Sequence, residues 1–257
     1  MENNLVYVPA QRPEYISDIL SSLKRYDTSI IRDLQRYLAQ QFDESFQDLN
    51  SNLALLKLYE ISGSDRQDDE DDEDDDDDEE EENESYSIKA LIKGLVNFSH
   101  NDFELYLNLL PSYVIINDQA PFIDSFNQQT QKLVSVYKLL TLGKFGKFWN
   151  EFENDAELAK ILKTHANPES LKLEFQKSIG TLIGISNKSI KRDFLQRVLN
   201  FKDAAALEAY VSANFSWKLE GDKYVVGNED DNSFVSISTE NVKLEQLTRL
   251  IKRTIEA

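Results

Sequence analysis

Residues 49–61 constrain this chain more than any other stretch, because a helix built from them is apolar almost all the way round. Their sequence, LNSNLALLKLYEI, leaves only a narrow polar stripe formed by Asn50, Lys57 and Glu60. A helix with so little polar surface has to be covered on more than one side. The amphipathic segments on either side are therefore predicted to be its neighbours in a stack of helices, although a central core helix of any all-α domain would show the same pattern.

Helical periodicity extends over most of the chain. Apolar residues recur at spacings of three, four and seven, and Pro13, Pro121 and Pro168 can each occupy a first helical turn, where the missing amide proton costs nothing. Helices are predicted over residues 13–24, 28–42, 46–61, 88–96, 101–110, 121–142, 157–165, 168–185, 188–199 and 204–213. No sequence period of fixed length links them, so the stack is repeat-like in shape at most.

Residues 142–152 (LGKFGKFWNEF) combine a dense aromatic cluster with two lysines. Four aromatic side chains recur there at helical spacing: Phe145, Phe148, Trp149 and Phe152. This spacing favours one buried helix face. Stacking on single-stranded nucleic acid is the less favoured alternative, suggested by the interleaved Lys144 and Lys147.

After residue 214 the apolar period changes to 2, which indicates β-strands. Gly221-Asp222 is typical of a two-residue hairpin turn with glycine first. The resulting register pairs Leu219 with Tyr224, Trp217 with Val226, and Glu220 with Lys223. A third strand is predicted near residues 234–237, and residues 244–255 are predicted to form a terminal amphipathic helix.

Residues 68–82 are fifteen consecutive carboxylates, which cannot be buried in any core. Residues 65–84 hold 17 of the 47 acidic and one of the 28 basic residues, so the formal charge of −19 becomes 30 acidic against 27 basic residues without them. We expect this insertion to be disordered and to loop out between helices, since closure cost grows slowly with loop length. A solvated spacer is favoured over a docking site for a basic partner.

Patterns for catalysis and metal binding are missing. The chain has no cysteine, and its eight glycines form no phosphate-binding loop. His100 and His165 are 65 positions apart and lie at predicted helix ends, where a cationic His165 suits the helix dipole. We therefore expect no enzymatic activity, no cofactor and no metal. Neither a membrane span nor a secretory signal is found, so a soluble intracellular protein is expected.

Five segments in order carry a family resemblance. They are LKRYDTSIIRDLQRYL (23–38), LNSNLALLKLYEI (49–61), LIKGLVNFSHNDFELYL (91–107), LGKFGKFWNEF (142–152) and FSWKLEGDKYVV (215–226). Together they resemble the k-subunit family of eukaryotic translation initiation factor three. The likeness covers residues 22–251 except for the acidic insertion, where the family is expected to have a short connection.

The resemblance implies a mainly α protein of PCI-type architecture, in which a HEAT-like helical repeat stack is followed by a winged-helix subdomain. The corresponding boundaries are a flexible arm at 1–12, a helical repeat-like domain at 13–165, the disordered insertion at 65–84, a winged helix at 166–238 and a C-terminal helix at 239–257. It also implies a non-catalytic cytoplasmic subunit that binds other PCI subunits, chiefly the l subunit, and reaches the small ribosomal subunit indirectly.

Partner contacts are predicted from the same patterns. A sheet edge at Tyr224 and Val226 can pair with a partner strand, and the terminal helix can place an apolar stripe in a groove. That stripe contains Leu247, Leu250 and Ile251.

Two alternatives stay open. PCI subunits of the proteasome lid and the COP9 signalosome share the architecture. An RNA-binding or acidic chaperone-like protein would instead use Lys188, Lys191 and Arg192 for RNA, or residues 68–82 for basic clients. DNA binding is disfavoured, because the third helix of the predicted winged helix, at residues 203–214, contains no lysine or arginine.

Overall fold

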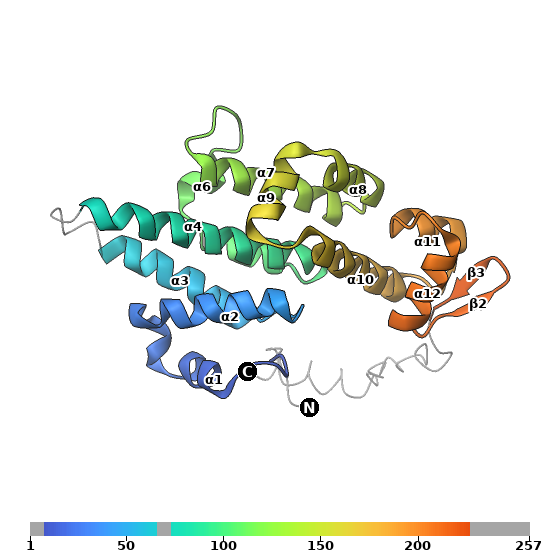
Figure 1. The fold of residues 1–257 in the computed structure, drawn as a ribbon, viewed down its shortest axis with the longest axis horizontal. Coiled ribbons are helices and arrows are strands. Elements are labelled where there is room, and N and C mark those ends of the chain that lie inside the picture. The colour runs from blue at the N-terminus through green and yellow to red at the C-terminus, as the bar shows by residue number, and fades with distance from the viewer. Residues whose placement is uncertain (1–7, 66–72, 227–257) are drawn as a thin grey trace, which may run out of the picture.

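A stack of helices leads into a smaller region of helices and short strands at one end of an elongated molecule (Figure 1). This computed structural model describes residues 8–65 and 73–226. The expected mainly α class is confirmed. We call residues 14–165 the helical stack and residues 168–226 the winged-helix region.

The helical stack is arranged around two central helices. Its elements are α1 Glu14–Ser21, η1 Leu23–Tyr26, η2 Thr28–Ile30, α2 Ile31–Asp43, α3 Leu49–Asp65, α4 Glu73–Val96, η4 Phe98–His100, α5 Asp102–Leu107, α6 Ser112–Ile116, α7 Ser125–Thr141, α8 Phe145–Asn154 and α9 Ala156–His165. α3 and α4 cross the middle, with α1 and α2 on one side and α6, α7 and α9 on the other (Figure 1). Leu55, Leu56 and Leu58 of α3 are at most 1% exposed, which confirms its predicted central position.

Side-chain caps fix where several helices begin. Asp124 accepts a hydrogen bond from Asn127 N at 2.6 Å before α7, and Asp155 accepts one from Leu158 N at 2.8 Å before α9. Each bond satisfies a backbone donor that has no partner within its helix. Asp155 is the single residue between α8 and α9, so its cap also sets this short connection.

Helix α4 begins within the acidic run, so the structure differs here from the disorder predicted for residues 65–84. Residues 66–72 lie outside the described residues. Carboxylates near a helix start interact favourably with its dipole, and the glutamates at residues 79–82 are good helix formers. The packed part of α4, where Ile88 and Leu91 are at most 1% exposed, supplies a nucleus from which the helix can extend.

A buried ion pair joins residue 12 to the stack. Arg12 donates to Asp48 from Nε at 2.5 Å and from Nη2 at 2.6 Å, and the Asp48 side chain is fully buried. The Tyr37 hydroxyl donates to the same carboxylate at 3.0 Å, and burial, followed by the Asp48 charge, raises the pKa of Tyr37. A flexible arm was expected over residues 1–12. Its described part, from residue 8, is instead tied down.

The winged-helix region contains α10 Pro168–Ser186, β1 Ser189–Lys191, α11 Arg192–Val198, α12 Ala204–Asn214, β2 Lys218–Glu220 and β3 Lys223–Val225. The strands form an antiparallel sheet in the order β1-β3-β2. The name of this region follows the winged helix predicted over residues 166–238, of which residues 166–226 are described. β1 replaces the start of the helix predicted at residues 188–199, and the strand predicted near residues 234–237 lies outside the described residues.

The β2–β3 hairpin has the predicted register. Leu219 lies opposite Tyr224 and Glu220 opposite Lys223. Gly221 occupies the first turn position with a φ of +64°, which a side chain would disfavour.

Candidate interaction surfaces

The winged-helix region is anchored to the stack by buried aromatic side chains. The rings of Phe148 and Phe175 meet edge to face with centroids 5.0 Å apart, and Trp149 Nε1 donates to Val198 O at 2.7 Å. Phe148 and Trp149 are buried, as their helical spacing predicted, whereas Lys144 and Lys147 are exposed. The aromatic cluster is therefore a packing element.

An ion pair crosses between α4 and α10. Lys93 Nζ lies 3.0 Å from Glu174 Oε2 and 4.6 Å from the centroid of the Phe42 ring, and the Lys93 side chain is 1% exposed. Burial lowers the pKa of Lys93, and the Glu174 charge opposes that change. Together with the aromatic contacts, this pair fixes the position of the winged-helix region on the stack.

An open cavity of about 380 Å³ lies beside this junction, between α2 and the α9–α10 connection. Phe42 and Leu171 give it apolar walls, and Lys89, His165 and Ser170 also line it. A hydroxyl and an imidazole in one cavity would suggest a nucleophile with its base. Both ring nitrogens of His165 are engaged by other residues, so these two side chains do not form such a pair.

His165 is held as a neutral ring. Its Nδ1 lies 3.2 Å from Ser85 Oγ and its Nε2 lies 3.1 Å from Gln129 Oε1. With Nε2 protonated, Nε2–H donates to the amide oxygen and Nδ1 accepts from the hydroxyl. Burial, and then the charge of Lys89, lower the pKa of His165. The structure therefore disagrees with the predicted cationic role of His165 at the end of α9.

Metal-ligating side chains do not converge in the part of the chain that the structure describes, where no group of three or more His, Asp or Glu residues is placed to hold an ion. His100 is exposed on η4. Over the same described ranges, no helix has the length and apolar character to cross a membrane.

Tyr224 and Val226 do not offer the sheet edge predicted for them. β3 is the central strand, paired with β1 on one side and β2 on the other, and Val226 N donates to Lys188 O at 2.9 Å. The two side chains are 2% and 8% exposed. β1, which the sequence analysis assigned to a helix, occupies the second edge of β3. The other predicted contact residues, Leu247, Leu250 and Ile251, lie outside the described residues.

The outer strand β2 is the edge that sequence reasoning missed. Among the residues described, β2 pairs with β3 alone. Leu219 at its centre is 43% exposed, and Ile185 and Phe194 in the same region are 82% and 48% exposed. The alternating pattern predicted that Leu219 is on the buried face of the sheet. Leu219 lies opposite the buried Tyr224, but the outer strand β2 is less buried than the central strand β3. An outer strand with unpaired backbone groups and an exposed apolar side chain such as Leu219 is typical of an edge that binds an added strand.

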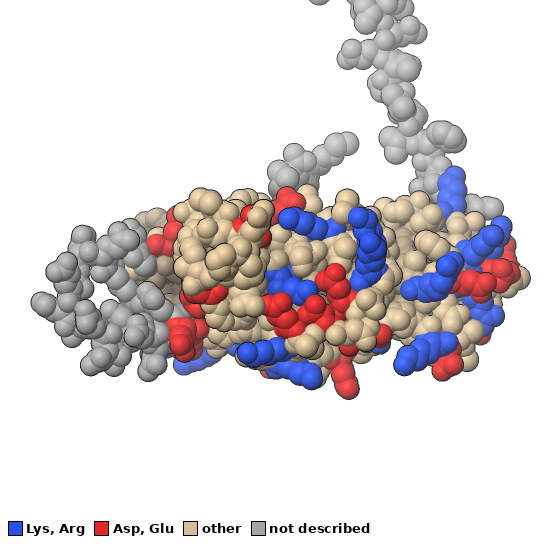
Figure 2. Space-filling model, turned by 90° about the horizontal axis from the view of Figure 1, so that it is seen from above, with Lys and Arg blue, Asp and Glu red and all other residues tan. Residues whose placement is uncertain are grey.

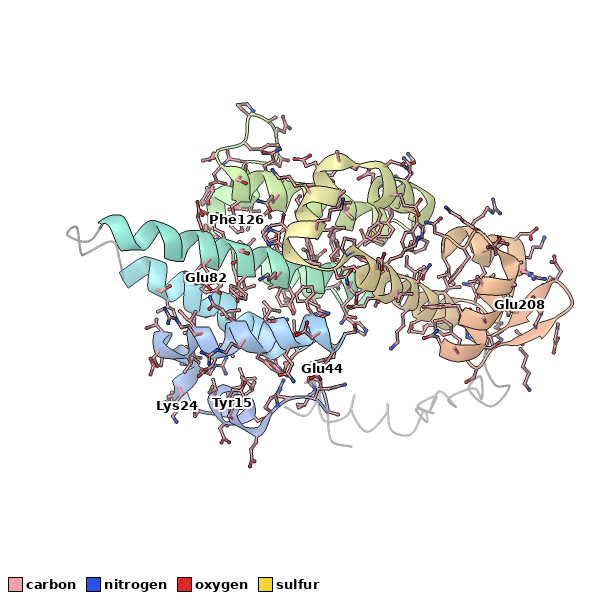
Figure 3. The ribbon with its side chains drawn as sticks, in the orientation of Figure 1. Tyr15, Lys24, Glu44, Glu82, Phe126 and Glu208 are labelled. Carbon is pink, nitrogen blue, oxygen red and sulfur yellow. The ribbon has the colours of Figure 1, made fainter. Side chains whose placement is uncertain are left out.

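Basic residues lie at the winged-helix end of the molecule with acidic residues among them, and further basic residues lie over the middle of the same face (Figure 2). Lys188 and Lys191 are exposed there. Arg192, grouped with them in the sequence analysis, instead pairs through Nη2 with Glu208 Oε1 at 2.6 Å. Figure 3 labels Glu208 in this region. Arg192 is thus paired with α12 whereas Lys188 and Lys191 are exposed, and RNA binding by these three residues stays a prediction.

The sequence of this chain is similar to one protein family and to several named proteins. The profile of the family described as CSN8/PSMD8/EIF3K matches residues 81–234. A Yarrowia lipolytica protein named eukaryotic translation initiation factor 3 subunit K is 35% identical over 249 residues, which cover 96% of this chain and 97% of the relative. Proteins of the same name from Phaeosphaeria nodorum and Cryptococcus neoformans are 28% identical over 253 residues and 29% identical over 255 residues, covering 96% and 95% of this chain and 95% and 93% of the relatives. The similarity spans both the helical stack and the winged-helix region.

Proposed function

Since the chain belongs to the CSN8/PSMD8/EIF3K family, we propose that it is a non-catalytic structural subunit of eukaryotic translation initiation factor 3 and acts in the cytoplasm. Relatives that bear the initiation-factor name match nearly the whole chain, which favours this role over the other two groups in the family description. The partner is another subunit of the same factor that carries a PCI domain, chiefly the l subunit. Contact with the small ribosomal subunit is indirect, through these partners.

The outer edge of β2, which pairs with β3 alone among the residues described, is the observation that carries the proposed mode of binding. An added strand satisfies the unpaired backbone groups of such an edge, and side chains next to it set specificity. Leu219, half exposed at the centre of β2, supplies an apolar contact at this edge.

The helical stack holds this edge in a fixed orientation. Trp149 and Lys93 connect the stack to α11 and α10 through buried contacts, so the winged-helix region does not move freely on a linker. Presenting a binding edge on a rigid support lowers the conformational cost of association. Neither the supporting stack nor the binding edge needs a catalytic side chain for this role.

Affinity purification of the tagged chain from cells tests the proposal, with co-purifying subunits quantified by mass spectrometry. We expect the wild-type chain to retain the l subunit and Leu219→Asp to lose most of it, because a charge is then desolvated at the contact. Leu142→Asp is the matched control, since Leu142 is 65% exposed at the end of α7, away from the sheet.

The two parts of the proposal fail in different ways. A wild-type chain that retains no initiation factor 3 subunit would refute the assigned role. Full retention of the l subunit by Leu219→Asp would leave the role standing and refute the β2 edge as its contact.

A further inference from the structure

The register of the sheet gathers lysines from all three strands on one face. Directly opposite residues of antiparallel strands point to the same face, and so do alternate residues along a strand. One row across the sheet is therefore Lys191, Lys223 and Glu220, and the row on the same face is Ser189, Val225 and Lys218. The row between them, Ile190, Tyr224 and Leu219, points to the opposite face.

Burial shows which of the two faces is turned to solvent. Ile190 and Tyr224 are 4% and 2% exposed, so their row packs against the helices. Lys191, Lys218 and Lys223 are all exposed. We call these three residues the wing lysines.

The wing lysines bring like charges together on the outer face of the sheet. Lys191 and Lys223 lie directly opposite each other, an arrangement in which like charges are destabilising. Within the described ranges, no carboxylate lies within 4.0 Å of any of the three ammonium groups. Glu220 is opposite Lys223 in the register but does not form an ion pair with it. An anionic ligand would relieve this repulsion.

We propose that the wing lysines bind the phosphodiester backbone of RNA. Lysine contacts phosphate as a point charge. Neighbouring strands are about 5 Å apart and alternate residues about 7 Å apart, so three such charges can follow successive phosphates. The inference goes beyond the proposed subunit role and does not depend on it.

An acidic protein is the less favoured ligand for this face. The cores of protein interfaces are enriched in aromatic residues and depleted in lysine. Apart from the half-buried Val225, the outer face of the sheet carries only polar and charged side chains, so it lacks an apolar anchor.

The contact should not read the base sequence. Reading bases from a groove requires cationic or amide side chains on the inserted helix. α12 has no lysine or arginine, and its one amide side chain, Asn214, is at its last position and donates to Tyr210 O. The acidic start of α4 lies at the end of the molecule opposite the winged-helix region (Figure 1). Because charges are screened over about 8 Å at physiological ionic strength, the chain's charge of −19 does not prevent anion binding at the wing.

Fluorescence anisotropy of the full chain with labelled oligouridylate tests the proposal at several salt concentrations. We expect a Kd of about 10⁻⁶ to 10⁻⁴ M, and a slope of log affinity against log salt of about −2, as three single-strand phosphate contacts predict. The variant K191E/K218E/K223E should bind at least about tenfold more weakly. The control K138E/K160E/K163E changes the charge equally at three exposed lysines of α7 and α9, and should bind within about twofold of wild type.

Three results would overturn the proposal: no binding by the wild-type chain at low salt, equal loss in the control variant, or displacement of RNA by a polyglutamate peptide of the same charge at the same concentration. The last result would assign the face to an acidic protein. Circular dichroism checks that each variant is folded. If charge reversal disrupts the sheet, K191Q/K218Q/K223Q replaces it, since this variant removes the charges together with their mutual repulsion and must give the same loss.

Discussion

The buried charges of the helical stack and the wing lysines of the winged-helix region are used in opposite ways. Two buried charges of the stack form cross-links: Asp48 pairs with Arg12, and Lys93 of α4 pairs with Glu174 of α10. In the winged-helix region, the wing lysines lie on an outer face without a carboxylate within 4.0 Å among the described residues.

This difference teaches which region holds the molecule together and which region faces other molecules. A buried charge is tolerated only when its partner is present, so the pairs of the stack depend on both members. Exposed charges contribute little to stability and are free to contact ligands. Substitutions in the two regions should therefore have effects of different size and, in one case, of opposite sign.

The largest effect is expected from Asp48→Ala in the stack. This change leaves Arg12 buried without its anion and removes the acceptor of the Tyr37 hydroxyl. The free energy of unfolding should fall by about 3 to 5 kcal/mol, measured by urea denaturation. Asp33→Ala is the control, because Asp33 pairs with Arg36 at the surface and should contribute no more than about 1 kcal/mol. A loss of under about 1 kcal/mol for Asp48→Ala would contradict the role of the stack charges.

Glycine substitutions compare how tightly the two regions are packed. A Cβ on Gly94 in the stack would lie 2.9 Å from the Cα of Phe103, a backbone atom, and one on Gly180 in α10 would lie 2.5 Å from the Phe215 ring. Both alanine variants should lose about 1 to 3 kcal/mol in thermal or urea unfolding, with Gly94→Ala losing more because a side chain yields more easily than a helix. Gly146→Ala in α8, which meets nothing within 4 Å, should be neutral or stabilising. A larger loss of unfolding free energy for Gly180→Ala than for Gly94→Ala would contradict this expectation.

A smaller, pH-dependent effect is expected from His165 in the stack. Its pKa is lowered by burial, so the unfolded chain binds this proton more readily than the folded chain. The stability that the neutral ring contributes is present above the unfolded pKa of about 6.5 and is lost as the pH falls toward the folded pKa. The free energy of unfolding of His165→Gln should therefore fall less steeply than that of wild type between about pH 7 and pH 5. Identical slopes would exclude His165 as the titrating group.

The smallest effect, with the opposite sign, is expected from Lys191→Thr. Removing one of two opposed lysines relieves repulsion and adds a residue with high strand propensity, so the free energy of unfolding should rise by about 0.2 to 1 kcal/mol. Lys188→Thr, just outside β1, should change it by less. Destabilisation by Lys191→Thr would show that the wing lysines are structural.

Local patterns predicted most of the fold. Helical spacing located the central helix and the aromatic face of α8, and the Gly221-Asp222 turn fixed the pairing of Leu219 with Tyr224. These features depend on residues close together in sequence, so a single sequence contains the relevant information.

Features that depend on distant residues escaped prediction. β1 is three residues long and exists because it pairs with β3, more than 30 positions later. Missing β1 made β3 look like an edge, which led to the wrong placement of Tyr224 and Val226 at a free edge. The partner of Arg12 lies 36 positions away and is equally invisible to periodicity. The beginning of α4 within the acidic run reflects packing further along the helix.

The buried ion pair of Arg12 with Asp48 also limits where the protein can be truncated or tagged. Pro9 is buried and Arg12 reaches Asp48, so a fusion partner placed directly before Pro9 would compete with both. Truncating the chain so that it starts at Pro13 would remove Arg12 and leave the Asp48 carboxylate without its cation. A tag with a generous spacer ahead of Met1 keeps this anchor intact.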